Sequence, residues 1–146
     1  MATYSFLDVK STLVGPGGSV NLGEGSAAAE EGITIRAVED IDTMTIGADG
    51  TPMHSLHANK SAHVEVHVLK TSPINQKLAQ MYALQTAAAV SHGQNTLTVT
   101  IPATGEIISC TSVAFKKAPD LTYAKEGGMN NWEFNAGTVD RVLGAY

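Results

Sequence analysis

TLTVTI, residues 96–101, alternates threonine with an aliphatic residue at every step. Because side chains along a strand point to opposite faces in turn, Leu97, Val99 and Ile101 share one face and the threonines share the other. Residues 63–68 (HVEVHV) repeat this pattern with three valines on one face. A period of two predicts strands of antiparallel sheets that have one apolar and one polar face.

Other stretches extend the β reading. Weaker alternation at residues 33–37 and 42–46 predicts two further strands. Residues 107–115 are apolar at both odd and even positions, which predicts a strand covered on both faces. Fifteen threonines, twelve valines and fourteen glycines fit strands separated by turns. Glycine and proline at 15–18 and 102–105 predict a loop and a short hairpin.

One segment has helical spacing instead. Ser72 can cap a helix, Pro73 suits the first helical position, and Gly93 favours a stop. The residues that recur at helical spacing in this segment are Ile74, Leu78, Met81, Gln85 and Ala88. The sequence therefore predicts a mainly-β fold of two packed antiparallel sheets or a β-barrel, with one flanking helix at about 73–90, in a single domain over residues 1–146.

Composition excludes several classes of protein. Nine Lys and Arg against fourteen Asp and Glu give a formal net charge of −5, and Lys116-Lys117 is the only basic pair, so tight phosphate-driven nucleic-acid binding is not expected. The lone Cys110 cannot form an internal disulfide, and its mid-strand position predicts a buried thiol. With no apolar run of about 18 residues and no signal-peptide pattern, we expect a soluble protein made in the cytoplasm.

Two segments, 20–31 and 47–61, are longer than strand connections require, and long loops are usually functional or disordered. The second, GADGTPMHSLHANKS, is too apolar for a solvated linker, so we interpret it as an arm that contacts another chain; the alternative is a self-packed surface loop. The residues expected to make subunit contacts are Asp49, Thr51, Met53, His54, Leu56 and His57 in the second segment, and Glu24 and Ser26 in the first.

The residues His63, Glu65 and His67 share one strand face and resemble a row of metal ligands. At ~3.3 Å per residue the two histidines stand about 13 Å apart, too far for two bonds of about 2.1 Å to one ion. We therefore expect no metal site, and interpret this face as facing solvent or another subunit. A small metal-dependent hydrolase is a hypothesis that rests on these three residues alone.

Other chemical motifs are weak. Residues 23–28 (GEGSAA) match the dinucleotide pattern G-x-G-x-x-A, but the strand predicted at 33–37 leaves no room for the helix which that motif requires. Cys110 has no glycine elbow to expose it, and Gly-x-Ser-x-Gly does not occur. We expect no cofactor and no enzymatic activity.

Nine stretches, taken in order, point to a known family: YSFLDV (4–9), GPGGS (15–19), EEGITI (30–35), TMTIGADG (43–50), HSLH (54–57), LKTSP (69–73), HGQNT (92–96), AFKKAP (114–119) and LTYAK (121–125). Over nearly its whole length the chain resembles the tail tube proteins of contractile-tailed phages and prophages. No single stretch is chemically diagnostic, so the resemblance depends on their order and number.

The resemblance implies a structural virion protein without enzymatic activity, related in fold to the inner tubes of type VI secretion systems and pyocins. It implies hexameric rings that stack into a hollow tube, with four strands from each subunit in a 24-stranded inner barrel. The implied partners are a tail sheath protein, baseplate and tail terminator proteins, a tape measure protein inside the tube before ejection, and genomic DNA that passes without specific binding.

Simple geometry fits that implication. Twenty-four strands at ~4.8 Å spacing and a tilt of about 40° give a backbone diameter of about 48 Å and a bore of roughly 38 Å, wide enough for duplex DNA. An acidic, threonine-rich wall would repel phosphates, and Glu39, Asp40 and Asp42 are the candidate lumen residues. The alternative function is a monomeric β-sandwich module that binds a carbohydrate or host surface, although one Trp and four Tyr supply few aromatic platforms.

Overall fold

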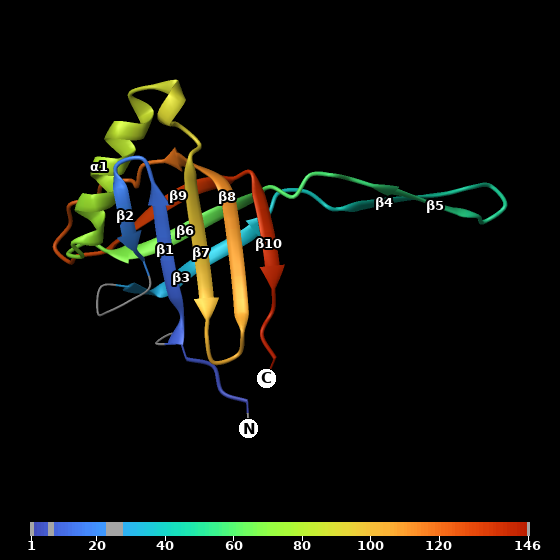
Figure 1. Cartoon of the computed structure of the whole chain (residues 1–146), viewed down its shortest axis with the longest axis horizontal. Helices are drawn as coiled ribbons and strands as arrows, with labels where there is room; N and C mark the ends of the chain where they lie inside the picture. Colours follow the sequence, from blue (N-terminus) through green and yellow to red (C-terminus); the bar gives the residue numbers. More distant parts are fainter. Residues whose placement is uncertain (1, 6–7, 23–27, 146) are drawn as a thin grey trace.

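Two β-sheets pack on each other in the structure, a computed structural model that describes residues 2–5, 8–22 and 28–145. One helix covers one end of the packed sheets, and a long hairpin projects from the other end (Figure 1). The strands of the two sheets run in clearly different directions, and the core lies between them. The sheets stay open, so the predicted two-sheet arrangement is confirmed and a closed barrel is not formed.

The first sheet, sheet A, contains the strand predicted at 96–101. In spatial order its strands are β2 (Gly18–Asn21), β1 (Lys10–Gly15), β7 (Asn95–Ile101), the first part of β8 (Glu106–Lys117) and β10 (Thr138–Val142), all antiparallel. The alternation of β7 is confirmed, because Leu97 and Ile101 are buried while Thr96 is exposed.

The second sheet, sheet B, contains the strand predicted from the three valines. Its strands in order are the last part of β8, β9 (Met129–Ala136), β6 (Ala62–Leu69) and β3 (Ala28–Ala37). Val64, Val66 and Val68 are fully buried against sheet A, together with Trp132 and Phe134 of β9. Sheet B therefore has one largely apolar face, as the alternation predicts.

Strand β8 belongs to both sheets, which explains why its apolar residues occupy both parities. Cys110 pairs with Leu97 and Val113 pairs with Asn95, so β8 has one extra residue in this interval. The bulge includes Ser112, whose φ is 53°. Before the bulge the even-numbered Cys110 is buried, and after it the odd-numbered Val113 and Phe115 are buried. The prediction of a strand covered on both faces is wrong, since Ile107 is 50% exposed.

The predicted helix exists, but it is shorter than expected. Helix α1 (Ile74–Thr86) begins where the sequence predicts, and the Ser72 hydroxyl accepts a hydrogen bond from the Ile74 N–H at 3.2 Å. It ends at Thr86 rather than near residue 90, because Ala88 is extended (φ −144°, ψ 139°) ahead of a short 3-10 helix, η2 (Ala89–Ser91). The alanines favour a helix locally, but the chain has to turn there to enter β7.

A buried pair of amides fastens α1 to sheet A. Gln85 and Asn95 exchange two side-chain hydrogen bonds of 2.8 and 2.6 Å, and the Gln85 amide also donates to the Pro16 carbonyl at 2.8 Å. Both side chains are almost completely buried. The pair therefore ties the helix to β7 and to the turn between β1 and β2.

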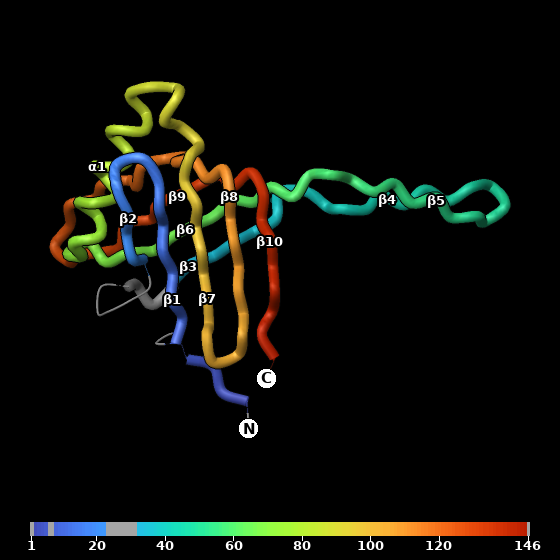
Figure 2. Tube along the Cα trace, viewed as in Figure 1, coloured from blue at the N-terminus to red at the C-terminus, as the bar shows by residue number. Residues whose placement is uncertain are grey.

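The projecting hairpin consists of β4 (Asp42–Ile46) and β5 (Pro52–Leu56), which form a two-stranded sheet of their own. In the trace of Figure 2 both legs run side by side, well clear of the packed sheets. The segment 47–61 is thus not wholly a loop, because its middle part is β5. We call the projection formed by residues 38–60 the arm.

Candidate assembly surfaces

The arm is closed by a compact turn at its tip. The Gly47 N–H donates to the Thr51 carbonyl at 2.8 Å, and Gly50 has a φ of +88°, a conformation that favours glycine. The Asp49 carboxylate accepts a hydrogen bond from the Thr51 N–H at 3.0 Å, and this bond holds the pKa of Asp49 below its usual value. Asp49 and Thr51 therefore shape the turn.

The two faces of the arm differ in polarity. Residues directly opposite one another in an antiparallel pair share a face, so the register places the apolar residues Met44, Ile46, Pro52 and Leu56 on one side, together with Asp42 and His54. Leu56 is 83% exposed, and Met44 and Ile46 are more than half exposed. The other side carries Thr43, Thr45, Met53 and Ser55. An isolated two-stranded hairpin is marginally stable in water, so this uncovered apolar face is suited to contact another molecule.

Histidines link the two strands of the arm. The Nδ1 of His54 lies 3.0 Å from a carboxylate oxygen of Asp42, and the Nε2 of His57 lies 2.7 Å from the Thr43 hydroxyl. Both histidines were expected at subunit contacts, and both are at least partly exposed. Such cross-strand contacts contribute little free energy in water, but they favour one register of the hairpin.

Met44 and Ile46 are not among the predicted contact residues, because the sequence pattern at 42–46 is interpreted as a strand in the body of the fold. The signal that could have identified them is the Gly-Ala-Asp-Gly tip at 47–50, which joins two short apolar segments as a hairpin does. Glu24 and Ser26 lie outside the described residues, so their predicted role as contacts is not addressed.

The base of the arm lies beside β10. The Val139 N–H donates to the Lys60 carbonyl at 3.1 Å, and a hollow of about 600 Å³ opens at this junction. Its lining includes Glu39, Asp40 and Arg141. Two of the three acidic residues expected in a lumen therefore lie at this junction, and the third, Asp42, begins β4; none of them is on sheet A.

The outer face of sheet A is rich in hydroxyl groups and nearly free of charge. On adjacent strands, Thr12 lies opposite Thr98, Thr98 lies opposite Ser109, and Ser109 lies opposite Asp140. The residues that the register and alternation place on this face are Lys10, Thr12, Val14, Ser19, Asn21, Thr96, Thr98, Thr100, Ile107, Ser109, Thr111, Thr138, Asp140 and Val142. Within the described strands, its charged members are Lys10 near one edge and Asp140 at the other.

Sheet A also has open edges. In the described part of the chain β10 pairs only with β8, and β2 pairs only with β1, so each strand has one side without a strand partner. An unpaired edge presents N–H and C=O groups that can pair with another chain. The two edges of sheet A are thus available for intermolecular pairing, except at Val139 of β10, whose N–H is bonded to the Lys60 carbonyl at the arm base.

The outer face of sheet B carries the His63, Glu65 and His67 row. The Nδ1 atoms of His63 and His67 lie 2.7 and 2.6 Å from the side-chain oxygens of Asn135 and Asn131 on β9. Glu65 lies directly opposite Glu133 in the register, an unfavourable pairing of like charges. Arg36 lies 3.1 Å from Glu65 and offsets it.

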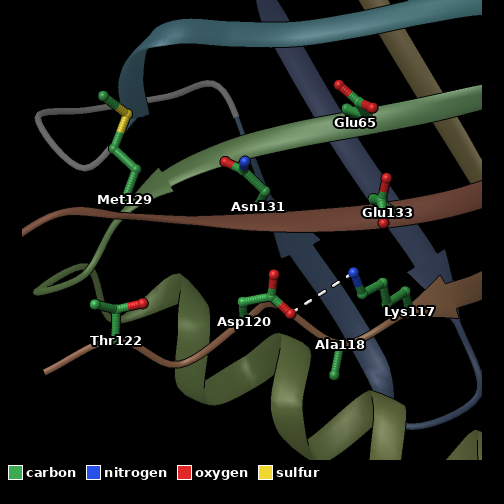
Figure 3. Close-up of a pocket in the computed structure, with 8 residues that line it drawn as sticks. All are labelled: Glu65, Lys117, Ala118, Asp120, Thr122, Met129, Asn131 and Glu133. Atoms are coloured by element: carbon green, nitrogen blue, oxygen red, sulfur yellow. Dashed lines mark ion pairs between the residues drawn. The ribbon is translucent and has the colours of Figure 1, made fainter.

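A hollow of about 280 Å³ lies over this part of sheet B, lined by Glu65, Glu133 and a segment that follows β8 (Figure 3). Lys117 and Asp120 form an ion pair of 3.6 Å at its side. Across residues 2–5, 8–22 and 28–145, no three His, Cys, Asp or Glu side chains come together as a group that could hold a metal ion. Cys110 is fully buried, and burial raises the pKa of its thiol, which disfavours the reactive thiolate.

Comparison with known proteins identifies the family. A family model described as "Bacteriophage PhiTE tail tube protein" matches residues 1–144. The chain belongs to this tail tube family. Its role is therefore that of a structural component of a phage tail or a tail-like particle, and this agrees with the predicted resemblance and points to a non-enzymatic protein.

Solved structures similar to this tail tube protein share its fold at low sequence identity. The anti-feeding prophage cap (AFP tube terminating cap) aligns with a TM-score of 0.59 and 10% identity, covering 99% of this chain and 93% of that chain. The PVC sheath-tube complex, from an extracellular contractile injection system in its extended state, aligns with a TM-score of 0.54 and 7% identity. The alignment covers 91% of this chain and 88% of that chain. No curated protein sequence gives a significant match. The helices in the described part of the tail tube protein are too short or too polar to cross a membrane.

Proposed function

We propose that copies of this tail tube protein join edge to edge into hexameric rings, and that stacked rings form the hollow inner tube of a contractile tail. The observation that carries the proposal is the pair of open edges on sheet A, at β2 and β10. A contact between two different edges is heterologous, so it continues from copy to copy and closes when the rotation fits. Ring closure would satisfy the unpaired backbone groups at both edges of sheet A.

The outer face of sheet A is the proposed lumen wall. All five strands of sheet A, β2, β1, β7, the first part of β8 and β10, would contribute from each copy, because the copies join through β2 and β10. Six copies would then supply 30 strands and a backbone diameter of about 60 Å, against about 48 Å for the 24-stranded barrel that the resemblance implies. The wall would be hydroxylated and close to neutral rather than acidic. With few cationic groups to displace counterions, such a wall does not retain DNA, so genomic DNA could pass without specific binding.

The arm is the proposed contact between copies, with Asp49, Thr51, Met53, His54, Leu56 and His57 in or near the contact. Complete burial of an aliphatic or Met side chain is worth about 1.5–3 kcal/mol. Since Met44, Ile46 and Leu56 are still half or more exposed, covering them would contribute roughly 1–2 kcal/mol each. This gain is large enough to support assembly when it is repeated around a ring. Any lumen role for Glu39, Asp40 and Asp42 would require the arm base to reach the bore.

The outer face of sheet B would point away from the bore, toward the tail sheath protein. Baseplate and tail terminator proteins would meet the two ends of the tube, and a tape measure protein would occupy the bore before ejection. The protein would act as part of the virion after synthesis in the host cytoplasm. Membership of the tail tube family supports these partners, each of which is a proposal.

Negative-stain microscopy of the concentrated protein tests the proposal. We expect rings or hollow tubes about 60 Å across at the barrel backbone. The double variant Met44→Asp/Leu56→Asp should remain monomeric, whereas Thr45→Asp on the other face of β4 is the matched control and should assemble. A wild-type protein that stays a monodisperse monomer at high concentration would refute the proposal, and a glycan-binding monomer would favour a carbohydrate-binding module.

A further inference from the structure

The C-terminal part of α1 and the adjoining η2 present a surface without charge. No Asp, Glu, Lys or Arg occurs between residues 78 and 105. Val90 is 83% exposed and Leu84 about half exposed, and Ala88 and Ala89 line a shallow hollow of about 340 Å³. Helices that face water usually carry charged residues on that side. Charge depletion around exposed apolar residues is typical of the centre of an interface.

The arm has the same chemical character. From Asp42 to Asn59 the arm contains two carboxylates, Asp49 in the tip turn and Asp42, which lies 3.0 Å from His54 on the face that carries Leu56. The apolar face defined by Met44, Ile46, Pro52 and Leu56 has no cover within the described part of the chain. These two uncovered apolar surfaces suit each other, because the carboxylate on the face of the arm, Asp42, already has His54 as its partner and docking would bury no unpaired charge.

The positions of these surfaces allow them to meet between copies but not within one copy. Figure 1 shows α1 and η2 at one end of the longest axis and the arm extending from the opposite end. Helix α1 contacts β2, the edge strand of sheet A at that end. The arm base is bonded to β10, the edge strand at the other end, through Val139 and Lys60. Joining β10 of one copy to β2 of the next therefore brings the arm of the first copy to α1 and η2 of the second.

The arm is long enough for this contact. Its leg from residue 38 to residue 47 spans about 30 Å at ~3.3 Å per residue, whereas five neighbouring strands at ~4.8 Å spacing are only about 24 Å wide. An arm that leaves the β10 side of one copy can pass the β2 edge of the next copy and lie along its α1–η2 surface.

We infer that the apolar face of the arm docks on the uncharged α1–η2 surface, at Leu84 and residues 88–90, of the adjacent copy. This inference rests on the edge-to-edge ring proposed above and adds the place where the arm is received. Each copy then gives an arm at one end and receives an arm at the other, so the contact repeats head to tail around the ring.

Site-directed cross-linking tests the docking site. Leu56→Cys in one chain and Val90→Cys in another are mixed, assembled, and treated with a short bismaleimide; the native Cys110 is fully buried and gives little background. The matched control pairs Leu56→Cys with Tyr123→Cys, since Tyr123 is 81% exposed. We expect at least tenfold more cross-linked dimer with Val90→Cys than with Tyr123→Cys. Equal yields, or a higher yield with Tyr123→Cys, would overturn the docking site.

Assembly of single variants gives a second readout. Val90→Asp should raise the protein concentration needed for assembly at least tenfold, as measured by light scattering, whereas Leu121→Asp, also at an exposed leucine, should change it less than twofold. Circular dichroism checks that both variants are folded. If wild type assembles and Val90→Asp assembles equally well, the docking site is wrong and the ring stands. If wild type itself does not assemble, the proposed ring fails and the docking site fails with it.

Discussion

Replacing Gln85 with leucine tests the contact that fastens α1 to sheet A. The substitution removes both hydrogen bonds to Asn95 and the bond to the Pro16 carbonyl. The Asn95 amide stays buried, and its side-chain oxygen and nitrogen lose the partners that the wild-type structure gives them. A leucine side chain fills much of the same volume, so the main effect is the loss of hydrogen bonding.

The size of the effect follows from the orphaned groups. Each buried polar group left without a partner costs about 1–3 kcal/mol, so the two groups of Asn95 predict a loss of roughly 3–4 kcal/mol in the free energy of unfolding. With a urea m-value of about 2 kcal/mol/M, the unfolding midpoint should fall by roughly 1.5–2 M. Removing Asn95 as well, in Gln85→Leu/Asn95→Leu, should cost about 2 kcal/mol less than the sum of the single variants.

Urea unfolding followed by tryptophan fluorescence is the assay. Trp132 is the only tryptophan; it is buried, and its ring contacts Tyr82 of α1 and Phe115 of β8, so its emission reports the packing of the helix. Gln80→Leu, at an exposed glutamine of the same helix, is the matched control and should change stability by less than about 0.5 kcal/mol. A loss below about 1 kcal/mol for Gln85→Leu, or strictly additive single variants, would refute this account of the amide pair.

Three further predictions concern single groups. Ser11→Ala should raise the free energy of unfolding by up to about 1 kcal/mol in thermal melts, because the Ser11 hydroxyl is buried with no hydrogen-bond partner in the described structure; a clear loss would contradict this. Since the pKa of Asp49 is lowered by its bond from Thr51, the support it gives the turn is complete above the ordinary carboxyl pKa and is lost as pH falls through the lowered value, which an NMR titration would show. Cys110 should resist alkylation at pH 8 in the folded protein and react after unfolding, since burial raises its pKa; rapid labelling of folded protein would count against a buried thiol.

Local patterns in the sequence were sufficient for the main elements. The period of two at residues 96–101 and 63–68 fixes which side chains share a face, because that depends only on strand geometry. Ser72 and Pro73 mark the start of α1, because capping is a contact between neighbours in the chain. The apolar content of residues 47–61 also pointed to an exposed segment suited to contact, although its role at a subunit interface stays a prediction.

Tertiary contacts decided the rest. The bulge at Ser112, which carries β8 from one sheet into the other, depends on pairing with Asn95 and Leu97 and leaves only an ambiguous pattern in the sequence. The end of α1 near residue 87 depends on the path into β7, which outweighs the helical preference of the alanines. The separation of the arm and the α1–η2 surface to opposite ends comes from the order of the strands in sheet A. Strand order is set by contacts between residues far apart in the chain, and a local pattern of side chains does not encode which strands those contacts will join.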